Sequence, residues 1–300
     1  MNTTSATSLE QLIAHNPLYQ IITNNRLHVL LTVVGLIGLV FAIEHLPYSP
    51  AVMSAVVSLI YGSYVLNIAF DRIEDETNYG PHYQVFWRST WATAIAILVL
   101  MGFPLALAIS HTPETTLITL LVMVPVSMYS IPFLHGGGSG PRRIKDIPLL
   151  KNSACALVWG AAVVLLPHVF LNVPLSSTSW ALFSLLVAMN FYVEVLWDLR
   201  DIDGDRKTGR MHSLPMLLGK QHTLSLLQAL NATIMLMTLW FVHTGWIPRL
   251  FLVYASLGIY NIFFITGYLK GDTTVKSHIY VMTNAAMVCI FAAIESGLAG

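Results

Sequence analysis

Two dense groups of acidic residues lie at the ends of apolar segments in a chain that is only 10% charged. The stretch "NIAFDRIED" occupies residues 67–75, and "DLRDIDGD" occupies residues 198–205. With their immediate neighbours, these stretches hold nine of the fifteen acidic residues of the chain. Carboxylates gathered this densely beside apolar sequence indicate a site for a positively charged partner.

The spacing of these residues places them along two helix faces, because residues three, four, seven and eight apart share one face of a helix. The first stripe consists of Asn67, Asp71 and Asp75. The second stripe consists of Asn190, Glu194, Asp198, Asp201 and Asp205. Two acidic stripes repel each other unless a cation lies between them. Oxygen-rich sites of this kind suit Mg²⁺ together with the oxygens of a phosphate ligand.

Basic and aromatic residues beside the acids extend this prediction to a substrate. The charge of a diphosphate could be neutralised by Arg72, Arg200, Arg206, Lys207 and Arg210. Ring faces that stabilise a carbocation could come from Tyr61, Tyr64, Phe70, Trp159, Phe191, Tyr192 and Trp197. A diphosphate head with an apolar tail is an isoprenyl diphosphate, whose C–O bond ionises when Mg²⁺ stabilises the departing group. We therefore predict a Mg²⁺-bridged diphosphate site that opens into an apolar chamber.

Glu194 lies one helical turn deeper than Asp198. It is either a base in the chamber or a carboxylic acid kept protonated by burial, and the sequence leaves both roles open.

The composition predicts an integral membrane protein with an all-α, polytopic fold. The chain of 300 residues is 55% hydrophobic, with a mean hydropathy of +0.67, whereas a soluble domain is nearer one quarter charged. Its formal net charge of zero offers no general attraction to nucleic acid. Apolar runs of about 20 residues predict nine transmembrane helices around a central cavity, at 27–46, 51–70, 91–110, 114–133, 150–172, 178–197, 221–243, 247–268 and 279–298. Residues 1–26 form a polar amino-terminal segment, and residues 27–300 form the transmembrane domain.

Basic residues predict the orientation of these spans, since Lys and Arg concentrate on the cytoplasmic side. In the nine-span arrangement, fourteen of the fifteen Lys and Arg residues fall on one side and only Arg249 falls on the other. The amino terminus, the long loops and the mouth of the acidic site are therefore expected on the cytoplasmic side of the cell inner membrane. The oligomeric state stays open.

The two acidic stretches also resemble a known family. "NIAFDRIED" fits an NxxxDxxxD motif, and "DLRDIDGDRKTGRMHSLP" fits a DxxDxxGDxxxG…LP motif, of the UbiA superfamily of intramembrane prenyltransferases. The stretch "YSIPF…RRIKDIPLLKN" is similar to that family's loop between helices 4 and 5. The resemblance implies one Mg²⁺ on Asn67, Asp71 and Asp75 and another on Asp198, Asp201 and Asp205. It implies diphosphate contacts from Arg142, Arg143, Lys145 and Lys151.

One departure from the family pattern keeps an alternative reaction open. Many quinone-pathway members carry an Asn-x-Pro-x-Arg-Pro stretch after the first motif, whereas this chain has "ETNYGPHYQVFWRST", in which Arg88 is the available cation. The leading hypothesis is transfer of an isoprenyl group to a small lipophilic, aromatic acceptor. The alternative is a terpene cyclase, in which the substrate's own double bond captures the cation. An ion-coupled transporter is disfavoured, because its acids would lie near the membrane midplane rather than at helix ends.

Overall fold

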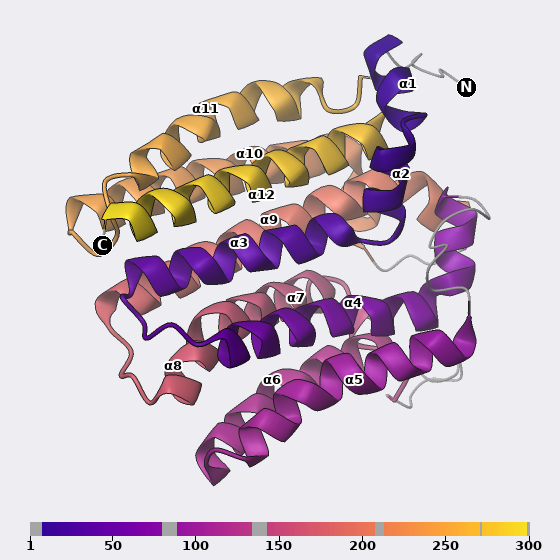
Figure 1. Cartoon of the computed structure of the whole chain (residues 1–300). Coiled ribbons are helices and arrows are strands. Elements are labelled where there is room, and N and C mark those ends of the chain that lie inside the picture. The colour runs from indigo at the N-terminus through magenta and orange to yellow at the C-terminus, as the bar shows by residue number, and fades with distance from the viewer. Residues whose placement is uncertain (1–7, 80–88, 134–142, 208–212, 271, 299–300) are drawn as a thin grey trace.

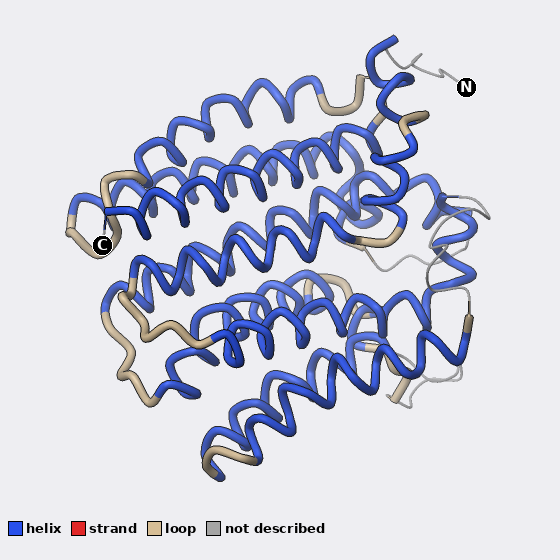
Figure 2. The backbone as a smooth tube through the Cα atoms, viewed as in Figure 1, coloured by secondary structure: helices blue, strands red, loops and turns tan. Residues whose placement is uncertain are grey.

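The computed structural model describes residues 8–79, 89–133, 143–207, 213–270 and 272–298, with side chains for all of these except residues 8, 73–79, 207 and 298. Within these ranges the regular structure is helical throughout (Figure 2). The amino-terminal part comprises α1 Ser8–Ala14, α2 Pro17–Asn24, α3 Leu27–Ile43, α4 Pro50–Tyr79, α5 Thr90–Ile109 and α6 Pro113–Ser130. The rest comprises the 3₁₀ turn η2 Ile144–Asp146, α7 Leu150–Gly160, the π-helical turn η3 Ala161–Leu165, α8 Leu166–Leu171, α9 Ser177–Lys207, α10 Leu214–His243, α11 Phe251–Gly267 and α12 Thr273–Leu298.

Polar caps and prolines explain where several of these helices begin. The Asn16 side chain accepts hydrogen bonds from backbone amides of the first turn of α2, directly before Pro17. The Thr112 side chain caps α6 in the same way, directly before Pro113. Each cap satisfies amides that lack a partner within the helix, and proline fits the first helical position because its missing N–H is not needed there.

Every one of the nine predicted spans overlaps a described helix, but the number of clear membrane spans is smaller. By length and composition, six of the described helices could cross a bilayer, or seven if α2 and α3, bent by 70°, form one broken span. The helix α11 has 17 residues, which is about 26 Å of helix against a hydrocarbon core of about 30 Å. The helix α6 opens with the polar sequence "PETT". The prediction counted apolar runs and so took both as full spans.

The helices run side by side in one bundle (Figure 1). The pairs α3–α12, α4–α5, α7–α9, α9–α10 and α10–α11 pack against each other. Glycine permits the close approach of α3 and α12: a Cβ on Gly35 of α3 would lie 2.7 Å from Sγ of Cys289 on α12. The span in α4 is 56% buried and the span in α5 only 22%, so α4 belongs to the interior and α5 to the rim.

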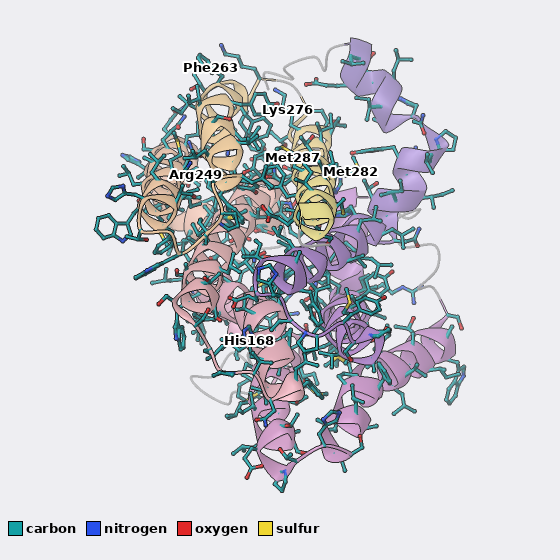
Figure 3. All side chains as sticks on the ribbon, turned by 60° about the vertical axis from the view of Figure 1, so that its left-hand side comes forward. His168, Arg249, Phe263, Lys276, Met282 and Met287 are labelled. Carbon is teal, nitrogen blue, oxygen red and sulfur yellow. The ribbon has the colours of Figure 1, made fainter. Side chains whose placement is uncertain are left out.

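The outer surface of the bundle is apolar, as a lipid-facing surface must be. Large side chains such as Leu98, Leu236 and Phe263 are each more than 60% exposed. Phe263 projects from α11 at the edge of the bundle (Figure 3).

The length of α4 and α9 determines where the acidic stripes lie. These helices have 30 and 31 residues, or about 45 Å each, which exceeds the hydrocarbon thickness. Their carboxyl ends lie at the same end of the bundle as α2, whereas the carboxyl end of α12 lies at the opposite end (Figure 1). Both acidic stripes are therefore carried to one end of the bundle.

Candidate active site

A cavity between α4, α6, α7 and α9 brings the two acidic stripes together. We call it the acidic cavity. Its acidic and amide side chains are Asn67, Asp71, Glu194, Asp198, Asp201 and Asp205. Its basic side chains are Arg26, Lys145, Lys151 and Arg200. The two stripes are more than 110 residues apart in the sequence. The packing of α4 near α9 makes them opposite walls of one space.

Basic side chains from the segment after α6 hold Asp71. Nη1 of Arg143 lies 2.8 Å from Oδ1 of Asp71, and Lys145 donates to Oδ2. Asp71 is only 4% exposed, and a buried carboxylate is strongly destabilised unless it is paired in this way. The η2 turn therefore places two cations at the wall formed by α4.

Asp146 fixes the position of Arg143. The Asp146 carboxylate accepts hydrogen bonds from the backbone amide and the guanidinium of Arg143, at distances from 2.8 to 3.2 Å. Although partial burial alone would raise the pKa of Asp146, these hydrogen bonds hold the pKa below its ordinary value. Arg143 thus bridges Asp146 and Asp71 and is held between them.

The wall formed by α9 is paired in a similar way. Lys151, in the first turn of α7, donates to Oδ1 of Asp198, and Nδ2 of Asn152 lies 2.9 Å from Oδ2 of the same carboxylate. Asp201 accepts two hydrogen bonds, of 2.6 and 2.7 Å, from its neighbour Arg200. The charges of the acidic cavity are thus largely balanced by lysine and arginine side chains that also face the cavity.

The chemistry of this donor set fits Mg²⁺, although the described side chains do not converge on one point. Carboxylate and amide oxygens are hard ligands of the kind that Mg²⁺ prefers. Among the described residues, no three His, Cys, Asp or Glu side chains are close enough to hold one metal ion as they stand. The side chain of Asp75, the third member of the first stripe, lies outside the described residues.

A second space, the inner chamber, adjoins the acidic cavity. Both spaces are lined by Tyr64, Trp159, Glu194 and Trp197. The rings of Tyr64 and Trp159 meet edge to face with centroids 6.1 Å apart. The Glu194 carboxyl accepts a hydrogen bond of 3.2 Å from the Cys155 thiol. The junction between the two spaces therefore carries three aromatic rings and one carboxyl group.

The predicted site residues divide into three groups. The acidic cavity contains Tyr64, Asn67, Asp71, Lys145, Lys151, Glu194, Asp198, Asp201 and Asp205. Arg143 reaches it through Asp71, whereas Arg72 and Arg206 are exposed and do not line it. Arg206 instead lies 3.9 Å from the exposed Asp203. Arg142, Lys207 and Arg210, like Arg88 of the departing loop, have side chains outside the described residues.

The structure adds residues that the sequence patterns did not single out for this site. Arg26 enters the acidic cavity because its backbone adopts a left-handed conformation, with φ of 58°, between α2 and α3. Its guanidinium lies 5.8 Å from the Trp197 ring, and that of Arg200 lies 5.4 Å from the same ring. Three asparagines of α10, α11 and α12 line the inner chamber: Asn231, Asn261 and Asn284. The available signal was an asparagine within each of three apolar helices.

The fold and the site define a polytopic α-helical membrane protein with an acid-rich cavity at one end of its bundle. The model of the UbiA prenyltransferase family matches residues 29–286, so the chain belongs to this family of intramembrane prenyltransferases. It is an integral membrane protein with multiple apolar spans and an enzyme of that family. No curated protein matches the chain.

Several solved structures share this fold. A UbiA homolog from Archaeoglobus fulgidus bound to GPP and Mg²⁺ has a TM-score of 0.65 and 15% identity, covering 93% of this chain and 99% of that one. An apo UbiA homolog from Aeropyrum pernix K1 has a TM-score of 0.63 and 15% identity, covering 89% and 98%. A digeranylgeranylglyceryl phosphate synthase structure has a TM-score of 0.61 and 16% identity, covering 91% and 95%. At these identities the likeness shows the fold.

Proposed function

We propose that this enzyme is Mg²⁺-dependent and transfers an isoprenyl group from a prenyl diphosphate to a small lipophilic, aromatic acceptor, releasing diphosphate. The observation that carries the proposal is the shared cavity: two acidic helix ends and several cations line one space that leads into an aromatic junction. A similarly folded homolog from Archaeoglobus fulgidus was solved with GPP and Mg²⁺, which supports the same ligand class here.

The proposed metal ligands are the two acidic stripes, comprising Asn67, Asp71, Asp75, Asp198, Asp201 and Asp205. When bound, Mg²⁺ would supply Lewis-acid stabilisation of the charge that develops on the departing diphosphate. The cations now paired with Asp71 and Asp198, which are Arg143, Lys145 and Lys151, would exchange these partners for diphosphate oxygens. Their positions at the cavity wall orient the head group toward the acids.

In this reaction the allylic C–O bond breaks, and its electron pair leaves with the diphosphate. The rings of Tyr64, Trp159 and Trp197 exclude water at the junction and present faces that stabilise the allylic cation. A carbon of the acceptor ring then forms the new C–C bond. The carboxylate of Glu194, which faces both spaces, takes the proton that this ring carbon loses.

We further propose that the nine helical segments over residues 27–300 all cross the membrane. The shortest of these segments are α3, α6 and α11, with 17, 18 and 17 residues. The amino terminus and the mouth of the acidic cavity would face the cytoplasm of a cell with this protein in its inner membrane. The carboxyl ends of α4 and α9, which share one end of the bundle with α2 (Figure 1), support a common side for the acids. Impermeant labelling of single cysteines at Arg249 and Lys220 in intact cells tests this, with labelling expected only at position 249.

The direct test is a mass-spectrometric screen of purified protein in nanodiscs. Prenyl diphosphates of several chain lengths are supplied with Mg²⁺, with and without phenolic acceptors, and both prenylated product and released diphosphate are measured. The expected result is diphosphate release that matches prenylated acceptor in amount. If a hydrocarbon forms in the absence of an acceptor, the enzyme is a terpene cyclase and the proposed prenyl transfer is wrong. If no diphosphate is released and liposomes show a cation flux that depends on Asp71 and Asp198, the protein functions as a transporter and the proposed reaction is wrong.

A further inference from the structure

The far wall of the inner chamber is polar but uncharged. It is formed by α10, α11 and α12 and includes Asn231, Asn261, Tyr254, Tyr280 and Asn284. An isoprenyl tail gains nothing from amide and hydroxyl groups, and polar groups within a membrane protein are costly unless they are paired or used. A wall of this composition suits a ligand with polar groups better than a hydrocarbon tail.

Hydrogen bonds between the helices fix this wall. Asn261 donates to Oδ1 of Asn231 at 3.2 Å and to the Tyr280 hydroxyl at 3.3 Å. The Tyr254 hydroxyl donates to Oδ1 of Asn284 at 2.8 Å. Asn231 in turn donates to the backbone carbonyl of Gly258 at 2.8 Å. Connected amides of this kind hold one another in a defined orientation, which is what recognition of a polar ligand needs.

Two buried donors at the chamber wall lack an acceptor. The Tyr192 hydroxyl and Nε1 of Trp197 make no hydrogen bond of ordinary geometry within the described part of the chain. The two side chains are 2% and 8% exposed, and both residues line the inner chamber. Buried donors are nearly always paired. The Tyr192 hydroxyl has the Tyr280 side chain as a polar neighbour, so a ligand oxygen is the acceptor that Trp197 lacks and one that Tyr192 can also use.

The charge of the chamber narrows the ligand further. No described lysine or arginine lines the inner chamber, and its one acidic side chain is Glu194. The described lysine and arginine side chains that line a cavity of the site, Arg26, Lys145, Lys151 and Arg200, line the acidic cavity instead. A carboxylate placed in the chamber would be buried without a cation and close to another carboxyl group, which is strongly unfavourable.

We propose that the inner chamber is the acceptor subsite and that its Asn/Tyr wall selects an uncharged, oxygen-bearing aromatic acceptor over an anionic phenolic acid. This inference rests on the prenyl transfer proposed above and specifies the class of its second substrate. The ligand oxygen accepts from Tyr192, and the amides of α10–α12 hold the polar edge of the ring. The ring then faces the junction where the allylic carbon is released.

A matched pair of probes tests this selection: 4-hydroxybenzamide and 4-hydroxybenzoate have nearly the same shape and differ in charge. Equilibrium binding of each to the purified protein is measured first, and turnover with a prenyl diphosphate and Mg²⁺ second. We expect the amide to bind at least about tenfold more tightly than the acid, because only the acid carries an unpaired charge into the chamber. Equal binding, tighter binding of the acid, or no binding of either probe would overturn the inference.

The variant Tyr192→Phe removes one hydroxyl and preserves the ring. It should weaken binding of 4-hydroxybenzamide about fivefold and leave the KM for prenyl diphosphate unchanged. Tyr260→Phe is the matched control, since Tyr260 is 55% exposed on the lipid-facing side of α11. If the two variants change the affinity for 4-hydroxybenzamide equally, Tyr192 does not bind the acceptor.

The binding and turnover measurements separate the two proposals. If no diphosphate is released with any acceptor, prenyl transfer fails while the binding comparison still decides the preference of the chamber. If diphosphate is released but the acid is the better acceptor, prenyl transfer stands and the inference on the acceptor is overturned.

Discussion

The acidic cavity and the inner chamber adjoin along α9, yet they satisfy their polar groups in opposite ways. The cavity balances full charges against each other, as between Asp198 and Lys151. The chamber links neutral groups, as between Asn261 and Asn231. Ion pairs of this kind exchange partners when a charged ligand arrives, whereas a network of amides keeps its geometry. The difference suits the cavity to a charged leaving group and the chamber to recognition of a neutral molecule.

Removal of divalent cations should separate the two regions most sharply. With excess EDTA we expect prenyl transfer to fall below detection and to return when Mg²⁺ is added, because the diphosphate then has no Lewis acid to stabilise its departure. Binding of 4-hydroxybenzamide to the chamber should change little, since the described wall consists of amides, hydroxyls and apolar groups with Glu194 as its single carboxyl group. Turnover that persists in EDTA would contradict the metal assignment of the acidic stripes.

The acidic stripe on α9 offers a matched pair of substitutions. Asp201 lines the cavity, whereas Asp203, two residues further along, is exposed and pairs with Lys220 at 2.9 Å. We expect Asp201→Asn to lower kcat by about 10²- to 10³-fold, the usual loss when one electrostatic contact to a transition state is removed. Asp203→Asn should stay within about twofold, in line with the small value of surface ion pairs. Similar kcat values for the two variants would mean that the stripe does not face the chemistry.

Glu194 lies at the boundary of the two regions. A substitution at this position shows whether its carboxyl group acts on the acceptor or on the departing diphosphate. If its carboxylate takes the proton from the acceptor ring, Glu194→Gln lowers kcat by about 10²-fold and leaves the KM for prenyl diphosphate unchanged. The measurement is steady-state turnover with diphosphate release followed in parallel. Continued diphosphate release with little prenylated product would assign Glu194 to the acceptor step, whereas loss of both in proportion would assign it to the cavity.

Local patterns predicted the helices and the acidic stripes well, because both depend on spacing along one segment. The predicted span 221–243 is an example: the structure has a break at Gly219, with φ of 78°, within α10. The polar sequence before residue 221 predicted that the membrane helix begins at nearly the same position. Asp71 and Asp198 directly follow the predicted spans 51–70 and 178–197, and the structure shows that both are buried at these positions.

The partners of those acids could not be predicted in the same way. Arg143 and Asp71 are 72 positions apart, and their contact depends on how the η2 turn packs against α4. Arg26 reaches the cavity only through a left-handed backbone conformation that few residues other than glycine adopt. The asparagines of the chamber wall lie together only because three helices pack against one another. The sequence of a single helix does not reveal this grouping. Tertiary contacts of this kind decide which polar residues share a site.

Substitution of Lys151 should have the smallest effect on turnover. It tests whether this lysine leaves its ion pair with Asp198 to bind the substrate. If Lys151 leaves Asp198 to bind a diphosphate oxygen, Lys151→Gln should raise the KM for prenyl diphosphate about tenfold, the upper range for one hydrogen bond to a charged group. The value of kcat should fall less, because the contact exists before as well as during bond breaking. Lys151→Arg, which keeps the charge, is the control and should recover most of the affinity. Because Asp198 also accepts from Asn152, it stays partly paired in the glutamine variant, and thermal unfolding should shift only modestly. A large loss of kcat with unchanged KM would instead mean that Lys151 positions Asp198. The cations of the cavity would then stabilise the carboxylates rather than bind the diphosphate.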